Sequence, residues 1–516
     1  MAWLPWAIGH GHDPFFTNAL YAGSGGVNEL ANGSILLPAF ILSPVTVLFG
    51  PIASFNVGVT LAPVVSAYCM FLFARKLTRF APAAIAAGLL WGYSPFVVES
   101  IPFGHLHDVV GFFLPLAGLV VHDLLVTQRR KPYTNGVLLG VLVVAQFFTG
   151  TEPLFVIAVT VPIGIVVGIL LVPRTFRDNR RALVLAIGSA VAVAAVVLAY
   201  PLWFATHGPR SVSGVIWPSA APLALSSVVN AGSQVGKSGL FVTHEAGYWG
   251  LLGPVYDFLG WGVVLFIVVS APVWWRRALA WCALVTGVWA WLLAGQVGPW
   301  VLVKGLPLAA SVQTYRFADV LVLCAAILVA ISIDEWHRRG PTLGKIATVG
   351  ACAAFIPVVL LYPLPFTEHT SPTPHWFETV ALRLRPGTRV LAVPFGGAPF
   401  AGSMVYQAED GFRFDLAGGY MLVPGTGGGS DFAHPLVGTT AILVSLSIPS
   451  APQPPITPEA LAGVRHSLHD WGIQVSVIPK PHEYPNAVTY LSAVYGRPPL
   501  VQHGAAVWYG GGAEGG

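Results

Sequence analysis

Charged residues are scarce in this sequence. Asp, Glu, Lys and Arg make up 9% of its 516 residues, whereas hydrophobic residues make up 55%. An ordinary soluble domain is about 25% charged, so the excess of apolar side chains has to face lipid. The formal net charge is only +4, and this total implies neither a nucleic-acid footprint nor an acidic partner.

Cysteine is also rare, and its placement excludes two kinds of structure. The four cysteines lie inside apolar runs, with no pair in a soluble loop and no CxxC spacing, so disulfides and structural zinc are set aside: Cys69, Cys282, Cys324 and Cys352. The first residues lack the basic region and the unbroken apolar core of a signal peptide. A nucleotide-binding GxGxxG between a strand and a helix is missing as well.

Apolar runs of membrane-spanning length fill residues 52 to 365. A typical bilayer needs about 20 apolar residues per helix, and on this basis about ten spans are predicted. They are expected near residues 52–74, 82–97, 109–127, 135–149, 154–172, 182–205, 249–270, 278–296, 317–333 and 346–365. The sequence therefore predicts an α-helical polytopic membrane bundle.

Basic residues mark every second loop, which predicts the orientation of the bundle. Lys and Arg are retained on the cytoplasmic side, and they gather after the first, third, fifth, seventh and ninth predicted spans. The other loops, and everything after residue 365, are then expected outside the plasma membrane. Residues 34–50 are apolar but short and interrupted twice by proline, so we interpret them as an interfacial or re-entrant helix on the outer face.

A second domain is predicted after residue 365, where the composition turns rich in proline and glycine. Residues 389–395, 441–448, 473–479 and 505–510 have the length and β-branched content of strands. Residues 457–472 begin with a threonine N-cap and follow a helical apolar period. The expected organisation is an outer segment over residues 1–51, a bundle over 52–365 and an extracytoplasmic α/β domain over 366–516.

The outer loops contain most of the polar residues that the fold does not explain. They comprise His10, His12, Asp13, Glu99, His105, His107, Asp108, Glu152, Arg210, Glu245 and Arg316. Ionisable groups at a membrane boundary lose hydration, so they tend to be paired or functional. The pattern predicts a site on the outer face.

Each of these residues has a functional and a structural interpretation. Glu152 stands in a short apolar turn and is a candidate base or ligand, although a first-turn acid also stabilises a helix dipole. His105 and His107 are candidates for binding a metal or a phosphate, or are interfacial hydrogen-bonding groups. Arg316 can fork onto phosphate or extend toward lipid headgroups. Glu245 can equally be a surface acid, and the HxHD of residues 10–13 is at most half of a metal site.

Several stretches resemble the GT-C superfamily of polytopic membrane glycosyltransferases, in particular a group of actinobacterial multi-pass proteins. The likeness lies in HGHDPFFTNALYAGSGGVNELANGS, FGPIASFN, GYSPFVVESIPFGHLH, QFFTGTEPL, THEAGYWGLLGP and TYRF, which occur in the expected order through the membrane part. The resemblance implies transfer of a sugar from a polyprenyl-phosphate donor to a glycan or lipid acceptor, with inversion and with a catalytic carboxylate in the first outer loop.

The resemblance also implies the roles of individual residues. Similar proteins have a further helix and an acidic residue before the first stretch. We therefore expect either that the start codon is placed too late, which we favour, or that Asp13 supplies the base. Arg316 and His105 are the expected cationic donors to the leaving phosphate, with a divalent ion such as Mg or Mn as the other source of positive charge. Glu152 and Glu245 are the expected acidic partners; Glu99, His107 and Arg210 are further substrate-binding candidates.

Two other classes of function stay open from the sequence. A transporter or flippase of lipid-linked intermediates would need ionisable groups near the middle of the bilayer, whereas the acids here gather at its outer edge. A non-catalytic assembly protein of the cell envelope would use its outer domain for binding. Aromatic residues of that domain can stack on sugars, but we favour a role in the core for them: Trp376, Phe400, Tyr406 and Trp508.

Overall fold

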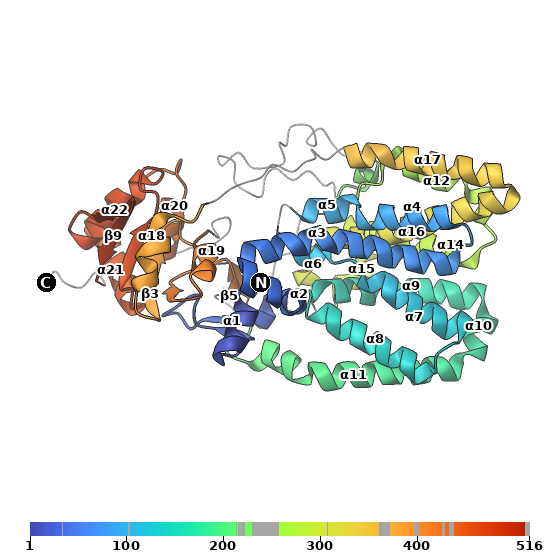
Figure 1. Cartoon of the computed structure of the whole chain (residues 1–516), viewed down its shortest axis with the longest axis horizontal. Helices are drawn as coiled ribbons and strands as arrows, with labels where there is room; N and C mark the ends of the chain where they lie inside the picture. The colour runs from blue at the N-terminus through green and yellow to red at the C-terminus, as the bar shows by residue number, and fades with distance from the viewer. Residues whose placement is uncertain are drawn as a thin grey trace. The chain divides into compact units, whose positions relative to one another are not determined.

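The computed structural model describes most of the chain (Figure 1). The described residues are 1–32, 35–101, 104–212, 214, 222–229, 257–306, 308–360, 372–396, 402–425, 429–432 and 438–510. The chain divides into two compact units. The first contains Met1–Ser54, Tyr200–Trp217 and Glu368–Gly516, and the second contains Phe55–Ala199 and Pro218–Thr367.

The second unit is a helix bundle that matches the predicted membrane part. Six helical stretches are long and apolar enough to cross a membrane: Ser43–Leu77, Ala81–Ser100, Leu106–Thr127, Glu152–Leu171, Arg180–His207 and Thr314–Arg339. Four shorter apolar helices coincide with the other expected spans: Pro132–Phe147, Gly260–Val269, Ala278–Ala294 and Pro341–Ile356. The expected run of 249–270 lies partly outside the described residues. A count of ten spans therefore stays a prediction.

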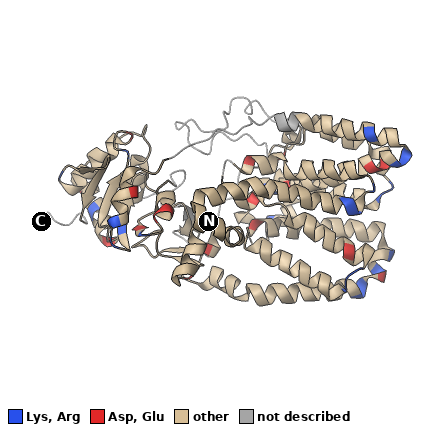
Figure 2. Ribbon diagram, viewed as in Figure 1, with Lys and Arg blue, Asp and Glu red and all other residues tan. Residues whose placement is uncertain are grey.

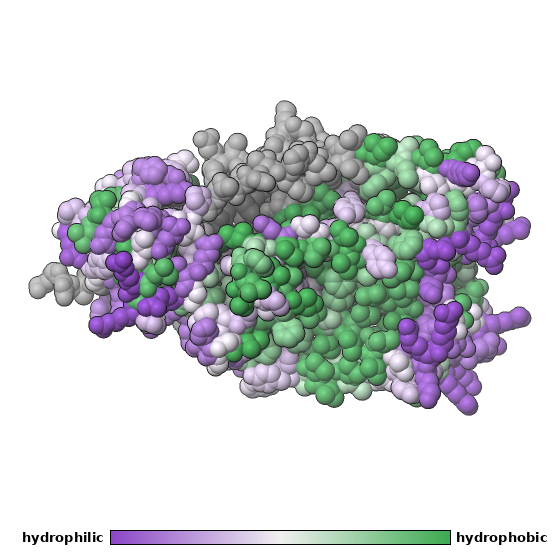
Figure 3. Space-filling model, viewed as in Figure 1, coloured by the Kyte–Doolittle hydropathy of each residue, from purple (hydrophilic) through white to green (hydrophobic). Residues whose placement is uncertain are grey.

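Helix α16 (Phe317–Arg339) is the central helix of the bundle. Its side chains are buried almost continuously from Phe317 to Asp334, and it packs against α4 (Ala81–Gly92), α14 (Ala278–Ala294) and α17 (Pro341–Leu360). Helices α9 (Glu152–Leu171) and α11 (Arg180–His207) lie at the periphery of the bundle and expose most of their apolar side chains. Figure 3 shows such side chains covering the face of the bundle, as expected for a surface in lipid.

The basic loops of the bundle gather at one end (Figure 2). There, Asp334 accepts hydrogen bonds from the backbone N–H groups of Arg79 and Phe80 at 2.7 and 2.9 Å, and from Arg338 Nε at 2.9 Å. Arg277 pairs with Glu335. Since α16 has 23 residues, its two ends are separated by about 35 Å, close to the thickness of a membrane core.

The first unit is an α/β sandwich with a mixed five-stranded sheet in the order β4-β3-β7-β9-β8. Strands β3 (Thr388–Ala392), β4 (Phe414–Leu416) and β7 (Val475–Ile478) are parallel, while β9 (Ala505–Tyr509) runs antiparallel between β7 and β8 (Leu500–Gln502). Helices α20 (Thr439–Leu446), α21 (Pro458–Asp470) and α22 (Pro485–Tyr495) pack on one face. Helix α18 (His375–Thr379) packs on the other face.

The predicted α/β class of this domain is confirmed, with one wrong element. The strands at 389–395, 473–479 and 505–510 are present, and Thr457 caps α21 by accepting a hydrogen bond from the N–H of Ala460 at 3.2 Å. Residues 441–448 were predicted as a strand but form most of α20. The buried residues of this segment, Thr440, Leu443 and Leu446, are three residues apart, which is the spacing of one face of a helix.

The N-terminal segment belongs to the same unit as the sheet. Helix α1 (Trp3–His10) precedes a short hairpin of β1 (Phe16–Thr17) and β2 (Val27–Asn28), whose loop runs along the edge of β4. Leu416 donates to the carbonyl of Ala19 at 2.8 Å and accepts from the N–H of Ala22 at 2.9 Å. The loop therefore covers an edge of the sheet that would otherwise be open.

The remaining N-terminal residues connect this hairpin to the first span. Helix α2 (Leu36–Ile41) is followed by α3 (Ser43–Leu77), which is kinked at Gly50 with φ 87°. Large apolar side chains are exposed before the kink, including Phe40, Val47, Leu48 and Phe49. A helical segment was expected at 34–50; its place at the membrane interface stays a prediction.

Candidate active site at one end of the bundle

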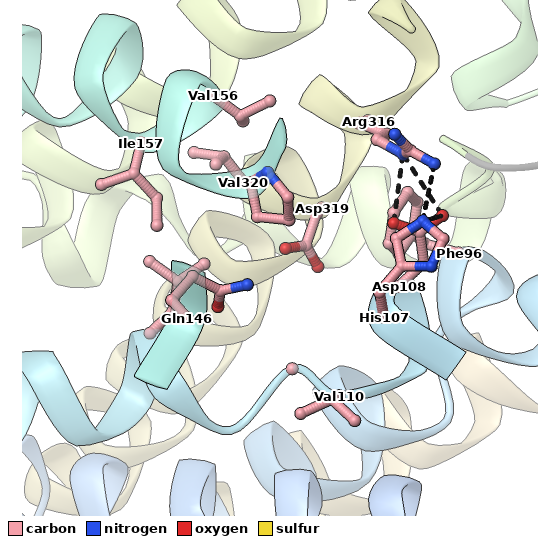
Figure 4. A pocket seen from close by; sticks show the side chains of 13 residues that line it. Phe96, His107, Asp108, Val110, Gln146, Val156, Ile157, Arg316, Asp319 and Val320 are labelled. Carbon is pink, nitrogen blue, oxygen red and sulfur yellow. Dashed lines mark hydrogen bonds and ion pairs between the residues drawn. The ribbon is translucent and has the colours of Figure 1, made fainter. Parts of the chain in front are cut away.

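Arg316 is the centre of a cluster at the end of the bundle opposite the basic loops. It ends a short 3-10 turn (Thr314–Arg316) that leads into α16, so the start of this helix fixes its position. Its Nε lies 3.1 Å from Asp108 Oδ1 and its Nη2 lies 2.9 Å from His107 Nε2 (Figure 4). Its Nη1 pairs with Glu152. The Tyr315 ring lies 5.5 Å from the guanidinium carbon.

Two separate segments, α6 and the start of α9, bring these partners to Arg316. His107 and Asp108 lie in the one-turn helix α6 (Leu106–Val109), which follows a turn at Gly104 with φ 71°. Glu152 opens α9, where Pro153 occupies the first turn. Proline is favoured in a first turn because it needs no hydrogen-bond donor there, so the TEP sequence sets the start of α9 and the place of its carboxylate.

The two carboxylates of the cluster differ in exposure. The Asp108 side chain is 1% exposed and the Glu152 side chain is 27% exposed. Glu152 Oε1 also accepts the backbone N–H of Gln313 at 2.9 Å. Glu152 is thus held in place but open to a ligand, whereas Asp108 mainly holds Arg316.

His105 joins the edge of this cluster. Its Nδ1 lies 3.6 Å from Asp108 Oδ2, and its ring centre lies 5.4 Å from that of His107. Burial and the positive charge of Arg316 lower the pKa of His105 against the opposing effect of Asp108. We therefore expect a neutral imidazole at physiological pH, which can donate or accept a hydrogen bond.

A pocket extends from the cluster into the bundle. Its empty volume, counted with its open mouth, is about 430 Å³. Arg316, His107 and Asp108 line one part, Phe96, Leu114, Val156, Ile157 and Val320 give it apolar walls, and Asp319 and Gln146 direct polar atoms into it (Figure 4). Polar and apolar side chains therefore both line the pocket, and in this conformation the enclosed space has room for about one or two water molecules.

Sequence reasoning missed two of these residues as site residues. Asp108 was noted in the HLHD sequence but not proposed for the site. Asp319 lies three residues after Arg316, on the same side of a helix, and this spacing in TYRFAD is the signal that could have identified it.

The other predicted site residues make no contact with Arg316 that the structure describes, belong to the first unit, or lie outside the described residues. Glu99 belongs to the bundle but is 1% exposed, and its Oε2 has no partner among the described residues. Asp13, His10, His12 and Arg210 belong to the first unit. Glu245 and Phe400 lie outside the described residues. Of the other outer-domain aromatics, Trp376 and Trp508 are buried in the core, and the Tyr406 ring packs 4.9 Å from that of Phe377.

The first-unit residues have local partners. Asp13 is exposed and its carboxylate accepts the N–H of Phe15 at 2.8 Å, as in an Asx turn. The rings of His10 and His12 stack on Trp6, with centres 4.6 and 5.0 Å away. Their roles as base and metal ligands stay predictions.

The donor set of the Arg316 cluster does not fit a divalent metal ion. Mg and Mn need several oxygen ligands, but both Asp108 oxygens face Arg316 and both Glu152 oxygens are engaged by Arg316 and Gln313. Within the described part of the chain, no three His, Cys, Asp or Glu side chains are placed together to hold a metal. We therefore derive no step through a metal.

Comparisons with known proteins add one finding about the fold. No family model and no curated protein matches the sequence. Among solved structures, the oligosaccharyltransferase of Archaeoglobus fulgidus in its apo form is similar, with a TM-score of 0.51 and 11% identity. The match covers 96% of this chain and 66% of the archaeal chain, so this chain spans slightly less than two thirds of its length. This likeness shows a GT-C-like fold for this chain. The six apolar helices of membrane-spanning length among the described residues make it a membrane protein.

Proposed function

We propose that this protein is a GT-C type membrane glycosyltransferase, which transfers a sugar from a polyprenyl-phosphate donor to an acceptor outside the plasma membrane. The observation that carries the proposal is the Arg316 cluster, in which one arginine and two acids meet beside a pocket at a single end of the bundle. Buried ion pairs cost desolvation and are weak evidence of stability alone. Their presence at the mouth of a pocket favours a functional role.

Glu152 is the residue we assign to the acceptor. It is the more exposed of the two carboxylates, and each of its oxygens keeps a second lone pair besides the one that faces Arg316 or Gln313. It can therefore accept a hydrogen bond from the attacking hydroxyl and take its proton as the bond to the anomeric carbon forms. The lipid phosphate then leaves with the electrons of the broken bond, and the sugar inverts. Arg316 and Asp108 fix the carboxylate in this position.

Arg316 itself is better suited to positioning than to binding a free phosphate. Its positive charge faces two carboxylates, so with neutral histidines the cluster has a net negative charge. Such a cluster attracts hydroxyl or amide donors more strongly than it attracts an anion. The net negative charge therefore disfavours the interpretation, made from the sequence, that Arg316 binds a phosphate with its two parallel donors.

The apolar interior of the bundle favours a transferase with a site at one end over a flippase that moves lipid-linked intermediates through the bundle. Between Asp319 and Ser332, the buried side chains of α16 are all apolar. A flippase needs polar groups along the path of the headgroup. Along the central helix of the described bundle, such a path is missing.

The proposal is tested by supplying radiolabelled polyprenyl-phosphate sugars to membranes that contain the full chain. We expect label to move from the lipid to a second product and to depend on expression of the protein. Loss of label from the lipid without a new glycoside, or transfer equal to that of empty membranes, would refute the transferase assignment.

A further inference from the structure

A cation without a partner lies in the first unit. Arg210 follows the end of α11 and makes no hydrogen bond or ion pair within the described part of the chain, although its Nε is shielded from solvent. Burial lowers the pKa of its guanidinium, and among the described residues Tyr21 is the ionisable neighbour that affects it. A partly desolvated charge is normally paired, and no carboxylate of the described residues pairs with this one, which leaves room for an anionic ligand.

The backbone around Arg210 is held in an uncommon conformation. Its φ is 56°, in the left-handed region that residues with a Cβ seldom adopt. The Asn28 amide donates to the carbonyls of Phe204 and Pro209, both at 3.1 Å. These bonds tie the end of α11 to the hairpin, so Arg210 is set in place by its surroundings. Constrained residues of this kind often occur at ligand sites.

A glycine-rich turn lies beside the Arg210 side chain. In the stretch Gly23–Gly26, Gly25 is exposed, has φ 101° and donates its N–H to no described residue. A Cβ on Gly25 would lie 3.3 Å from Arg210 Cδ and 3.6 Å from its Nε. The positive φ of Gly25 favours glycine at this position. The turn therefore brings a backbone N–H that bonds to no described residue close to the Arg210 side chain. Backbone N–H groups in positive-φ turns form anion-binding concavities.

We propose that Arg210 and the Gly23–Gly26 turn bind a phosphate group. A guanidinium presents two parallel donors that match two phosphate oxygens, and the turn adds a backbone donor at its side. Helix α11 is a candidate span that ends at His207, so we expect Arg210, three residues further on, near the depth of lipid headgroups. A lipid headgroup and a soluble phosphate ester share this chemistry. The inference does not depend on the proposed glycosyl transfer.

The test measures binding by the full chain in a phosphate-free detergent. The probes are radiolabelled inorganic phosphate and radiolabelled phosphatidylglycerol, each measured by co-elution with the protein. We expect the wild type to retain at least one of them and R210M to weaken retention about tenfold or more. R210K keeps the charge but loses the fork, so it should weaken retention less. R383M is the matched control, because it removes an exposed arginine of the same unit.

The outcomes separate the two sources of phosphate. Retention of phosphatidylglycerol alone assigns the site to a lipid headgroup, and retention of both probes assigns it to phosphate groups in general. If R210M does not fold, the comparison of R210K with R383M decides. The proposal is overturned if the wild type retains neither probe, if the Arg210 variants bind like the wild type, or if R383M weakens retention as much as they do.

Discussion

The contacts of Arg316 show how single residues build the candidate site. Asp108 and Glu152 come from α6 and α9, and the guanidinium connects them through two different nitrogens. A lysine has one ammonium group and cannot make both contacts in this geometry. The arrangement thus depends on the shape of arginine as well as its charge.

We predict that R316K lowers the thermal stability of the protein in detergent. Asp108 is 1% exposed, and because lysine keeps the charge but can make only one of the two contacts, we expect a loss of about 1–3 kcal/mol. R338K is the control, because Arg338 pairs with Asp334 at the more exposed end of α16, where the loss should stay below about 1 kcal/mol. Equal melting temperatures for R316K and the wild type would show that the cluster is not tightly coupled.

A second prediction concerns Asp410 in the first unit. Burial and the neighbouring acids Glu409 and Glu378 raise the pKa of Asp410 to about 7. The folded state then binds its proton more tightly than the unfolded state, so this stability is present at low pH and is lost as the pH rises toward 7. D410N should raise the melting temperature at pH 8, and the gain should shrink at pH 5. A gain that is larger at pH 5 would contradict this account.

Some site residues could be predicted from the sequence and others could not. Glu152, His107 and Arg316 stood out because charged groups are rare beside apolar runs, and the structure brings them together. Asp319 looked like an ordinary helix residue. Whether Asp13 joins them depends on the placement of a different unit, which local patterns do not encode.

Among the helices, α8 (Pro132–Phe147) and α11 pack through small residues. A Cβ on Gly136 would lie 2.2 Å from the Ala186 carbonyl oxygen, and one on Gly140 would lie 2.8 Å from that of Ala190. Small residues four apart let helix backbones approach closely in membranes. Little of α11 is buried, so this close contact with α8 is an important part of its packing.

We predict that G136A destabilises the bundle while G188A does not. The added methyl at 136 forces the two helices apart, whereas a Cβ at Gly188 on α11 meets nothing within 4 Å. In the exposed helix position, alanine should even favour folding slightly. Melting temperatures of the two variants in detergent provide the measurement. A similar loss in both would show that α8 and α11 do not pack through Gly136.

The errors at the level of elements have a common cause. Residues 441–448 are apolar and short, and such runs do not separate strands from buried helices by period alone. Helix α19 (Gly402–Glu409) and strand β4 were not predicted either. Tertiary contacts decide these elements, for example Gln407, whose amide donates to the carbonyls of Ala19 and Phe414 at 2.7 and 2.8 Å.

For the whole molecule, we propose that the C-terminal residues lie outside the cytoplasm. The basic loops gather at one end of the bundle (Figure 2), as the alternating pattern predicted. A C-terminal fusion to a reporter that is active only in the cytoplasm should stay silent. A fusion after Lys131, in a basic loop, should be active. Strong activity of the C-terminal fusion would reverse the orientation and place the Arg316 cluster on the wrong side.

The most direct test of the central claim compares two glutamates of the purified, reconstituted protein. E152Q keeps the shape of the side chain but removes its charge, so transfer of labelled sugar from polyprenyl phosphate should fall about a hundredfold or more. E335Q removes an acid that pairs with Arg277 at the opposite end of the bundle, and it should leave transfer unchanged. Wild-type transfer by a folded E152Q protein would contradict the account.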